Sequence, residues 1–494
     1  MKLKYIFPSW LAVSVLTPLP VVDGYITSGL PRHVHQAWLK KMTSDICDVS
    51  PGDLTPEMCV KAPELMSAWA QNPYVSHAPL KKKRINHHNN NKNVYPHHGR
   101  ECAMAAEQLL KRLVDERRAG NENAIATTDA YNACLDIWAR SGEGVFAAQR
   151  AEQILIGMQD LYSGGDTNVQ PNTQTFHAVI LAWAKAGNRD ESFMHRANQV
   201  LEWMVHLNRT GDNHLALPDE ECFNTVLHGW ASSSHPDAPH KTEDLLMLMN
   251  QLYSDGLTSS RPTTVQFNQV LSAWSRSTSD TAAQRSQDIL NHMERIQNTE
   301  SDKDLEPDSM TYSIVCATWA KSGLPDAVYK ADALLKKIEQ QAAYMDDPQL
   351  YPDNITYNIV IDAWAKDGSK TAFKNARALL DRQIDLYDNK GIKKCRPDVY
   401  GFTSVIASCA SIKSSWKDKS TAFDVALATF NDLDQLSYDS PNHVTYGTIL
   451  KACSKLLQAG SKQRRQNVRK IFRKCCEDGC AGYMVFSRLK QAAS

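Results

Sequence analysis

The sequence predicts an all-α protein, a right-handed superhelical solenoid of stacked helix-turn-helix hairpins. Eight times along the 494 residues, an aromatic residue is followed by apolar residues at the third and fourth positions and by Trp or Cys at the seventh. This spacing is one stripe of an α-helix, and its recurrence every 44 to 47 residues indicates a repeat array. The eight stripes begin at Tyr131, Phe176, Phe223, Phe267, Tyr312, Tyr357, Phe402 and Tyr446.

A second helical pattern follows the stripes, in which a small or neutral residue precedes an apolar pair and often a Met. The set Ala197/Val200/Leu201/Met204 is an example. A Gly between the two patterns, such as Gly323, is a natural helix stop. Each repeat is therefore predicted to be a helical hairpin, which cannot bury its stripe alone and must stack on its neighbours.

A proline opens each later hairpin, and Asn or Asp follows six of the seven prolines. Pro is tolerated at a helix start because its missing N–H would have no partner there. A small residue one place after the Trp or Cys, such as Ala184 or Ser275, lets two helices approach closely. The prolines are Pro171, Pro218, Pro262, Pro307, Pro352, Pro397 and Pro441.

Four segments are predicted from these patterns. Residues 1–55 form a leader and flexible segment, and residues 56–126 form a degenerate first repeat with a polar His/Asn-rich loop. Residues 127–478 hold the eight repeats, and residues 479–494 form a C-terminal tail. No strand-type alternation of any length interrupts the array, so a second fold class inside it is not expected.

Composition suggests a role for two segments within residues 1–100, one at the N-terminus and one near residue 90. Lys2 and Lys4 precede a mostly apolar run that ends at Val22, which is typical of a signal sequence. Three prolines in this run argue against a membrane-spanning helix, and an apolar but disordered terminus is the alternative. The stretch from Lys81 to His98 predicts a disordered polar loop. A nuclear signal, a phosphate contact and a metal-binding His cluster are the alternatives for that stretch.

The charge and the cysteine content exclude few classes of function. The formal net charge is zero, so no global electrostatic argument for nucleic acid exists. Between Lys451 and Lys490, however, eleven Lys and Arg residues face only Glu477 and Asp478. That end either attracts a phosphate backbone or is a solvated helix face. The twelve Cys do not form a disulfide framework or a set of four zinc ligands, and no metal or cofactor is expected.

The repeat openings resemble those of pentatricopeptide repeat (PPR) proteins. The resemblance rests on Pro352-Asp353-Asn354-Ile355-Thr356-Tyr357 and the residues that follow to Lys366, and on the segments that begin at Pro307 and Pro441. It covers about 350 of the 494 residues. The repeats run about ten residues longer than the family's, partly between Trp364 and Ala376 and partly between Ile338 and Pro352.

This resemblance implies sequence-specific binding of single-stranded RNA, with one base per repeat. In the family, a first reader follows the aromatic of the first helix. Here the first readers are Asn132, His177, Asn224, Asn268, Ser313, Asn358, Thr403 and Gly447. A second reader follows the next repeat's Pro. The second readers are Asn172, Asp219, Thr263, Asp308, Asp353, Asp398 and Asn442.

The reader residues also have a purely structural interpretation. Asn and Ser/Thr offer donors and acceptors that discriminate base edges. Asn or Asp after Pro is equally a good helix N-cap, and Asn after the aromatic would tie adjacent repeats together. We favour base reading for most of these positions because the family register fits.

A third family position lies three residues before the first reader and covers the face of the base. It is apolar or aromatic in the later repeats, at Val265, Met310, Ile355, Tyr400 and Val444. In the earlier repeats it holds Asp129, Gln174 and Glu221, and the two carboxylates would repel phosphates. Repeats from about 262 onward are therefore expected to carry most of the affinity. The family's pairings predict a core of U-G-U-A.

Two other functions are weighed against RNA binding. An appended nuclease or zinc deaminase, as in some relatives, needs carboxylate clusters or a Cys/His zinc site. Only about eighteen residues follow the last repeat, so no catalysis and no small-molecule substrate are expected. The other alternative is a protein-binding α-solenoid scaffold in an organellar RNA or ribosome complex. Family habit places such proteins in mitochondria or plastids, with RNA-processing or ribosomal proteins as further candidate partners and no membrane integration.

Overall fold

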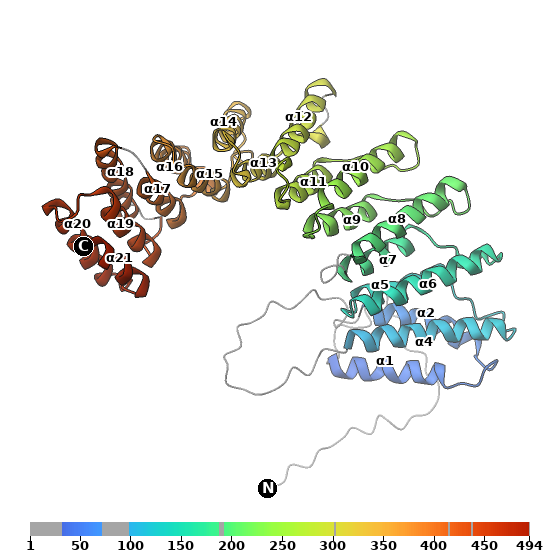
Figure 1. The fold of residues 1–494 in the computed structure, drawn as a ribbon. Helices are drawn as coiled ribbons and strands as arrows, with labels where there is room; N and C mark the ends of the chain where they lie inside the picture. Colours follow the sequence, from blue (N-terminus) through green and yellow to red (C-terminus); the bar gives the residue numbers. More distant parts are fainter. Residues whose placement is uncertain are drawn as a thin grey trace, which may run out of the picture. The chain divides into compact units, whose positions relative to one another are not determined.

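The described part of the chain consists of helices. The computed structural model describes residues 32–71, 98–186, 192–300, 303–412, 415–435 and 438–493. These ranges contain twenty α-helices, three short 3-10 helices and no strand. Two compact units divide the chain, Met1–Pro171 and Asn172–Ser494, and both consist of helices that contact their neighbours along the chain (Figure 1). The predicted all-α class and stacked-helix architecture are confirmed, while the handedness of the superhelix stays a prediction.

The first unit begins earlier than the repeat pattern indicates. A helix lies within residues 1–55, which the sequence patterns assign to a flexible segment. It folds because Leu39 and Ile46 are buried, and because the Trp69 indole donates a hydrogen bond of 3.0 Å to Thr43 Oγ1 on that helix. The helices of this unit are α1 (Arg32–Cys47), α2 (Pro56–Ala70), α4 (His98–Arg118), α5 (Thr128–Arg140), α6 (Val145–Ser163) and the 3-10 helix η1 (Thr167–Val169).

The second unit alternates two kinds of helix, which we call A and B. Each A helix carries one of the aromatic stripes, and each B helix carries the second pattern. The A helices are α7 (Thr173–Ala186), α9 (Glu220–Ser232), α11 (Thr264–Arg276), α13 (Ser309–Ser322), α15 (Asn354–Asp367), α17 (Val399–Ser411) and α19 (His443–Leu456). The B helices are α8 (Ser192–Thr210), α10 (Ala238–Ser254), α12 (Ala282–Glu300), α14 (Ala327–Met345), α16 (Ala372–Asp388), α18 (Trp416–Gln435) and α20 (Lys462–Glu477).

The A helices form a continuous layer in this unit. Each A helix contacts its own B helix and also the next A helix, from α7 through α19. The last A helix packs against α21 (Tyr483–Ala493). Direct contact between successive B helices is sparser, with α16 against α18 as the clearest case. A residue at a fixed position of each A helix therefore lies in one row with its counterparts.

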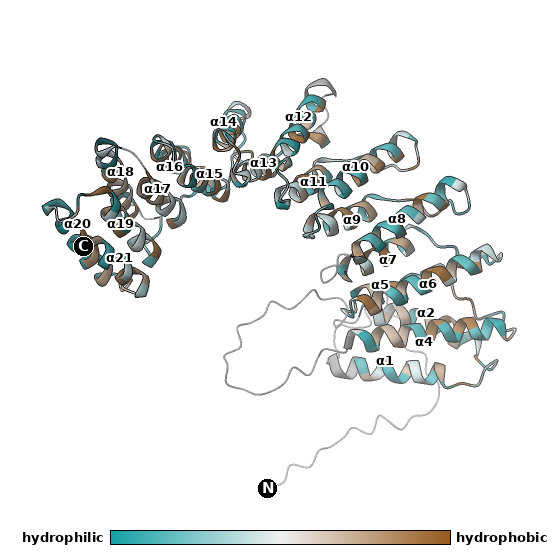
Figure 2. Ribbon diagram, viewed as in Figure 1, coloured by the Kyte–Doolittle hydropathy of each residue, from teal (hydrophilic) through white to brown (hydrophobic). Residues whose placement is uncertain are grey.

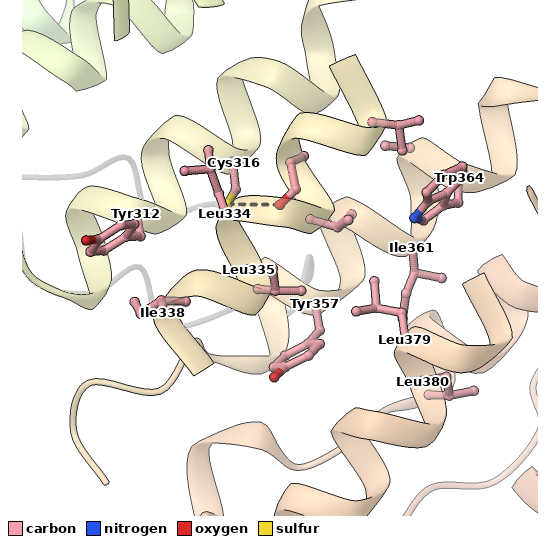
Figure 3. Packing of buried hydrophobic residues seen from close by; sticks show 14 of the residues in the cluster. Tyr312, Cys316, Leu334, Leu335, Ile338, Tyr357, Ile361, Trp364, Leu379 and Leu380 are labelled. Atoms are coloured by element: carbon pink, nitrogen blue, oxygen red, sulfur yellow. Dashed lines mark hydrogen bonds between the residues drawn. The ribbon is translucent and has the colours of Figure 1, made fainter. Parts of the chain in front are cut away.

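Buried aromatic and aliphatic side chains explain the stacking. Figure 3 shows Tyr312 and Cys316 of α13 packed with Leu334, Leu335 and Ile338 of α14, beside the stripe of α15. Apolar residues lie mostly along the helix faces that meet (Figure 2). Burial of such a side chain contributes roughly 1.5–3 kcal/mol. The stripes predicted from the aromatic spacing are therefore the core of the array.

The Trp at the seventh position also has a polar role. The Trp274 indole N–H donates to Glu243 at 2.7 Å, and the Trp319 indole N–H donates to Gln287 at 3.1 Å. Both acceptors lie on the B helix of the preceding repeat. A buried indole usually finds such a partner, so Trp274 and Trp319 fix their hairpins against the previous ones. By contrast, the indole N–H groups of Trp230 and Trp364 have no hydrogen-bond partner among the described residues.

Local signals set the helix ends. Asp308 and Asp353 cap α13 and α15, where each carboxylate accepts a hydrogen bond from the third backbone N–H of the helix. Gly323 and Gly368 end the same two helices with φ of 64° and 69°, a left-handed conformation that favours Gly. The predicted N-caps and Gly stops are thereby confirmed at these repeats.

The extra length of the repeats is partly helical. The sequence places added residues between Ile338 and Pro352, and α14 continues seven residues beyond Ile338 to Met345. Short 3-10 helices precede two of the later repeats, η2 (Lys303–Leu305) and η3 (Lys393–Cys395).

The segment predicted as a C-terminal tail, residues 479–494, contains the helix α21. Val485 and Ala492 are buried, and the Arg464 guanidinium donates 2.8 and 2.7 Å hydrogen bonds to the carbonyls of Ala492 and Gln491. The tail folds because it covers the end of the last stripe, which would otherwise be exposed to water.

Several expectations concern sites outside this core. The proposed leader and most of the polar loop from Lys81 to His98 lie outside the described residues. No helix in the described ranges is both long and apolar enough to cross a membrane. Across the same ranges, no group of three His, Cys, Asp or Glu side chains is arranged to hold a metal ion. The described cysteines are free thiols, and burial raises the pKa of Cys316 to about 12.

Candidate functional site

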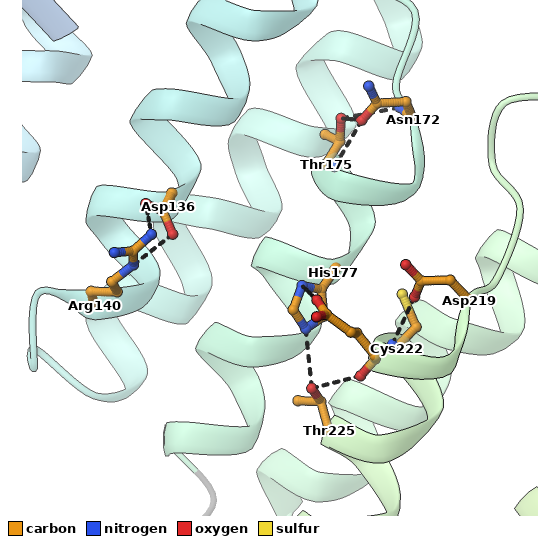
Figure 4. A network of polar contacts seen from close by, with 9 residues as sticks. Asp136, Arg140, Asn172, Thr175, His177, Asp219, Cys222 and Thr225 are labelled. Atoms are coloured by element: carbon orange, nitrogen blue, oxygen red, sulfur yellow. Dashed lines mark hydrogen bonds and ion pairs between the residues drawn. The ribbon is translucent and has the colours of Figure 1, made fainter. Parts of the chain in front are cut away.

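The second readers lie at the start of the A helices, where they act as N-caps. Asp219 accepts a hydrogen bond from the Cys222 N–H at 2.9 Å, and Asn172 accepts one from the Thr175 N–H at 3.1 Å (Figure 4). Thr263 belongs to a capping box in α11. The same cap contacts occur at Asp308, Asp353, Asp398 and Asn442. These side chains therefore have the cap role whether or not they also read a base.

The structure brings one reader pair into direct contact at Asn268 and Asp308. The Asn268 Nδ2 group of α11 donates a hydrogen bond of 3.2 Å to Asp308 Oδ1 at the start of α13. Thr311 Oγ1, one turn into α13, lies 2.8 Å from Asn268 Oδ1. Asn268 is only 8% exposed. Both ends of its amide are therefore satisfied by the next repeat.

A second pair has the same geometry but a different environment. Asn358 Nδ2 donates hydrogen bonds of 3.0 Å to both oxygens of Asp398. The position that Thr311 holds in α13 is Gly401 in α17, so no hydroxyl reaches the amide oxygen. Asn358 Oδ1 is buried and has no hydrogen-bond partner. An unsatisfied buried acceptor costs about 1–3 kcal/mol, and this oxygen lies against Gly401, where an added Cβ would come within 2.7 Å of it.

At the two remaining steps, Ser313/Asp353 and Thr403/Asn442, a Thr hydroxyl lies within hydrogen-bond distance of both readers. Thr356 Oγ1 lies 2.7 Å from Ser313 Oγ and 2.7 Å from Asp353 Oδ1. Thr445 Oγ1 likewise lies 2.8 Å from Thr403 Oγ1 and 3.2 Å from Asn442 Oδ1. A first reader and the second reader of the next repeat thus lie side by side at four successive steps, from Asn268 to Asn442.

The earlier repeats differ in their contacts. His177 lies 3.1 Å from Thr225 Oγ1 of α9 and 3.8 Å from Glu221, rather than next to Asp219 (Figure 4). Asn224 accepts a hydrogen bond of 2.8 Å from the Gln266 side chain. Asn132 is buried. His177 thus does not form the direct contact between first and second reader that Asn268 and Asn358 form in the later repeats.

Exposed apolar side chains accompany the later readers. Each lies at the second position after its N-cap, on the first turn of the A helix, and faces solvent. Their exposed fractions are 53% for Val265, 61% for Met310, 61% for Ile355, 53% for Tyr400 and 42% for Val444. A row of exposed apolar groups beside paired polar groups is a surface that can cover and read flat, polar-edged rings.

The sequence patterns above miss a row of cations. A Lys or Arg lies in the last turn of six of the eight repeat A-type helices, always nine residues after the aromatic. The six are Arg140, Lys185, Arg276, Lys321, Lys366 and Lys455. Aligning the repeats on the aromatic would have shown this row. Asp362 lies 2.6 Å from Lys366 and raises its pKa by a hydrogen bond.

No family model matches the chain, and no curated protein matches it as a relative.

Proposed function

We propose that this protein binds single-stranded RNA in a sequence-specific manner through the first turns of its A helices, as the likeness of its repeats to PPR proteins implies. One observation carries the proposal. At Asn268–Asp308 and Asn358–Asp398, the two readers of one step lie within hydrogen-bond distance of each other. An exposed apolar side chain flanks each pair. A base needs both features, a polar pair for its edge and an apolar surface for its face.

The chemistry of the pairs supports discrimination among bases. An Asn amide offers donors and acceptors, whereas an Asp carboxylate only accepts. Their mutual hydrogen bond fixes the orientation of the amide before a ligand arrives. The family's pairings assign U to Asn268/Asp308 and to Asn358/Asp398, G to Ser313/Asp353 and A to Thr403/Asn442. The resulting core is U-G-U-A.

The cation row supports contact with a phosphate backbone. The six Lys and Arg side chains lie two turns along from the readers in six of the eight repeats, and each is exposed. Phosphate contacts of this kind supply affinity without base specificity. The earlier repeats carry exposed Asp129 and Glu221 at the base-face position, so the later repeats contribute most of the affinity.

The proposed cellular role is in organellar RNA metabolism. The chain acts in RNA processing, stability or translation inside a mitochondrion or plastid and has no catalytic activity of its own. RNA-processing or ribosomal proteins would complete the reaction on the bound transcript.

A titration with fluorescent RNA tests the proposal directly. The full chain is titrated with a pool of single-stranded 20-mers and with a duplex of the same length, at two salt concentrations. We expect binding of the single strand that weakens with salt by about 0.7 logarithmic units per phosphate contact and per tenfold rise in salt. Equal binding of the duplex, or no binding at low salt, would contradict the proposal.

The second candidate function is a protein-binding scaffold. Asn268 favours it, because both ends of its amide are already occupied by the next repeat. In that case the reader row only ties hairpins together, and partner proteins bind the exposed apolar row. Capture of a protein that resists high salt, without RNA binding, would select this function.

A further inference from the structure

The last A helix, α19, breaks the pattern of the reader row. Its first-reader position is Gly447, which has no side chain. One turn later stands Lys451, and one turn after that stands Lys455. Residues four apart on a helix are neighbours on one side. The last repeat thus offers two successive cations next to a position where the preceding repeats offer a polar reader.

The position of Lys451 carries the opposite charge in two other repeats. The residue at this position is Asp136 in one repeat and Asp362 in another. Each Asp forms an ion pair with the cation one turn later, Arg140 or Lys366. The Asp362–Lys366 contact is 2.6 Å. In α19 the acid is replaced by a second base. The last-turn cation of this repeat is therefore joined by another cation instead of being paired within its helix.

The helix α21 brings a third cation to the same place. The Met484 methyl group of α21 would lie only 3.1 Å from a Cβ atom added to Gly447, so the two helices touch at this level. One turn further along each helix, Arg488 comes beside Lys451. Partial burial lowers the pKa of Lys451, and the charges of Lys455 and Arg488 lower it further.

No carboxylate compensates this charge within the described residues. Neither Lys451 nor Lys455 forms an ion pair there, and the hydrogen bond of the Arg488 guanidinium goes to the neutral Gln491 side chain at 3.0 Å. Lys451 is partly buried and interacts with the charges of both Lys455 and Arg488, so the cations repel one another in the protein alone. An anion bound among them would remove that repulsion and gain charge-assisted hydrogen bonds.

We propose that Lys451, Lys455 and Arg488 form a phosphate-binding site that holds the RNA backbone at the C-terminal end of the array, beyond the last base-reading step at Thr403. This site rests on the proposed RNA binding and adds to it a contact that ignores base identity. At Gly447 itself no side chain selects a base, because this glycine is buried under Met484 of α21. A phosphodiester is the anion that such a strand presents at regular spacing.

The site is tested with RNA that carries phosphates without bases. Three probes are compared. One is the best-bound RNA core alone, and the other two carry three additional abasic ribose-phosphate units, one at the 5′ end and the other at the 3′ end. We expect one of the two extensions to raise the affinity of the full chain roughly tenfold at low salt. The triple variant K451Q/K455Q/R488Q should bind the unextended core more weakly only by the single cation-row contact of Lys455. It should lose the gain from the extension, with a salt slope for the extended probe about 2 units lower for three lost phosphate contacts.

A matched variant controls for net charge. K462Q/R469Q/K470Q removes three exposed cations from α20, in the same terminal region but on the B helix, and should keep the gain. An equal loss in this control, or an unchanged gain in the triple variant, would overturn the site. Tighter binding of polyglutamate than of the extension would assign the cations to an acidic protein partner and also overturn it. If the wild type binds no core RNA, the proposed function itself fails, which is a distinct result.

The triple variant is not expected to unfold. Its three side chains are partly or fully exposed, and their neutralisation removes repulsion, so the melting temperature should stay the same or rise. A lower melting temperature would show that the three cations stabilise the fold, and that result would contradict a ligand site.

Discussion

Asn268 and Asn358 hold the same place in two repeats but differ in what surrounds them. Thr311 completes the hydrogen bonds of Asn268, whereas Gly401 leaves the amide oxygen of Asn358 without a partner. Base reading at Asn268 requires that a ligand replace an internal hydrogen bond. At Asn358 the amide oxygen has no internal hydrogen bond that a ligand must replace, although it lies buried against Gly401. We therefore expect the Asn358 step to discriminate bases most strongly.

The variant Asn358→Ser tests the register of the readers. Ser beside Asp398 reproduces the Ser313/Asp353 pair, so the preferred base at this one step should change from U to G while the neighbouring steps keep theirs. The measurement is the affinity for four RNAs that differ only at this base. An unchanged preference at this step would show that the register is wrong.

The variant Thr311→Val tests the structural role of the same row. Val keeps the shape of Thr but removes the hydroxyl near Asn268 and Asp308, so a buried acceptor loses its donor. The free energy of unfolding should fall by about 1–3 kcal/mol in urea denaturation. Thr421→Val is the control, because that exposed hydroxyl contacts only the Lys417 carbonyl of its own helix. Equal effects of the two variants would contradict a role in joining repeats.

At the scale of elements, the repeat helices are predictable and the end helices are not. The A helices carry a stripe, a cap such as Asp353 and a stop such as Gly368, and all three signals agree. The helix α1 has no matching repeat to reveal it, and its fold depends on a long-range contact between Trp69 and Thr43. The pairing of Asn358 with Asp398 follows from the register, but the sequence alone does not show that Gly401 leaves the buried amide oxygen of Asn358 without a partner.

The first unit contains a buried carboxylate, Glu116, that links α4 to the α1–α2 loop. Glu116 on α4 accepts hydrogen bonds from the Gly52 N–H at 2.7 Å and from Asn121 at 3.2 Å, and it lies 2.7 Å from the Arg112 guanidinium. Burial would raise the pKa of Glu116, but the Gly52 and Asn121 hydrogen bonds and the Arg112 charge together lower it.

This lowered pKa predicts how stability depends on pH. A carboxylate whose pKa is lower in the folded state stabilises the fold above its unfolded value of about 4.3, and that contribution is lost as the pH falls through the folded value. The first unit should therefore lose stability below about pH 4. Glu116→Gln should lower stability at pH 7 by about 3 kcal/mol and flatten its dependence on acid. An acid response as steep as that of the wild type would contradict this role.

At the scale of the whole molecule, cations and exposed apolar side chains recur at fixed positions of the repeats, without an excess of positive charge over the chain. The net charge is zero, yet cations recur in the last turns of the A helices and exposed apolar groups recur in the first turns. The composition alone therefore gives no sign of a nucleic-acid surface. Only the alignment of the repeats reveals these rows, and within the second unit the fold places successive A helices next to one another.

The exposed aromatic Tyr400 tests whether the later repeats hold the bases. Its replacement by Ala should weaken RNA binding by about 1–3 kcal/mol, because a stacking surface is lost, without changing the melting temperature. The matched control is Tyr344→Ala, since Tyr344 is more exposed than Tyr400 but lies on the B helix α14. Equal losses in both variants would show that binding does not depend on the A-helix row.

The central claim is that the reader row selects RNA bases in register. The most direct test is selection of bound sequences from a random single-stranded RNA pool by the full chain, sequenced at two salt concentrations. We predict enrichment of a U-G-U-A core, with less bound RNA but the same core at higher salt. A pool that stays random at low salt would contradict base reading, and a defined but different core would keep RNA binding and reject the register.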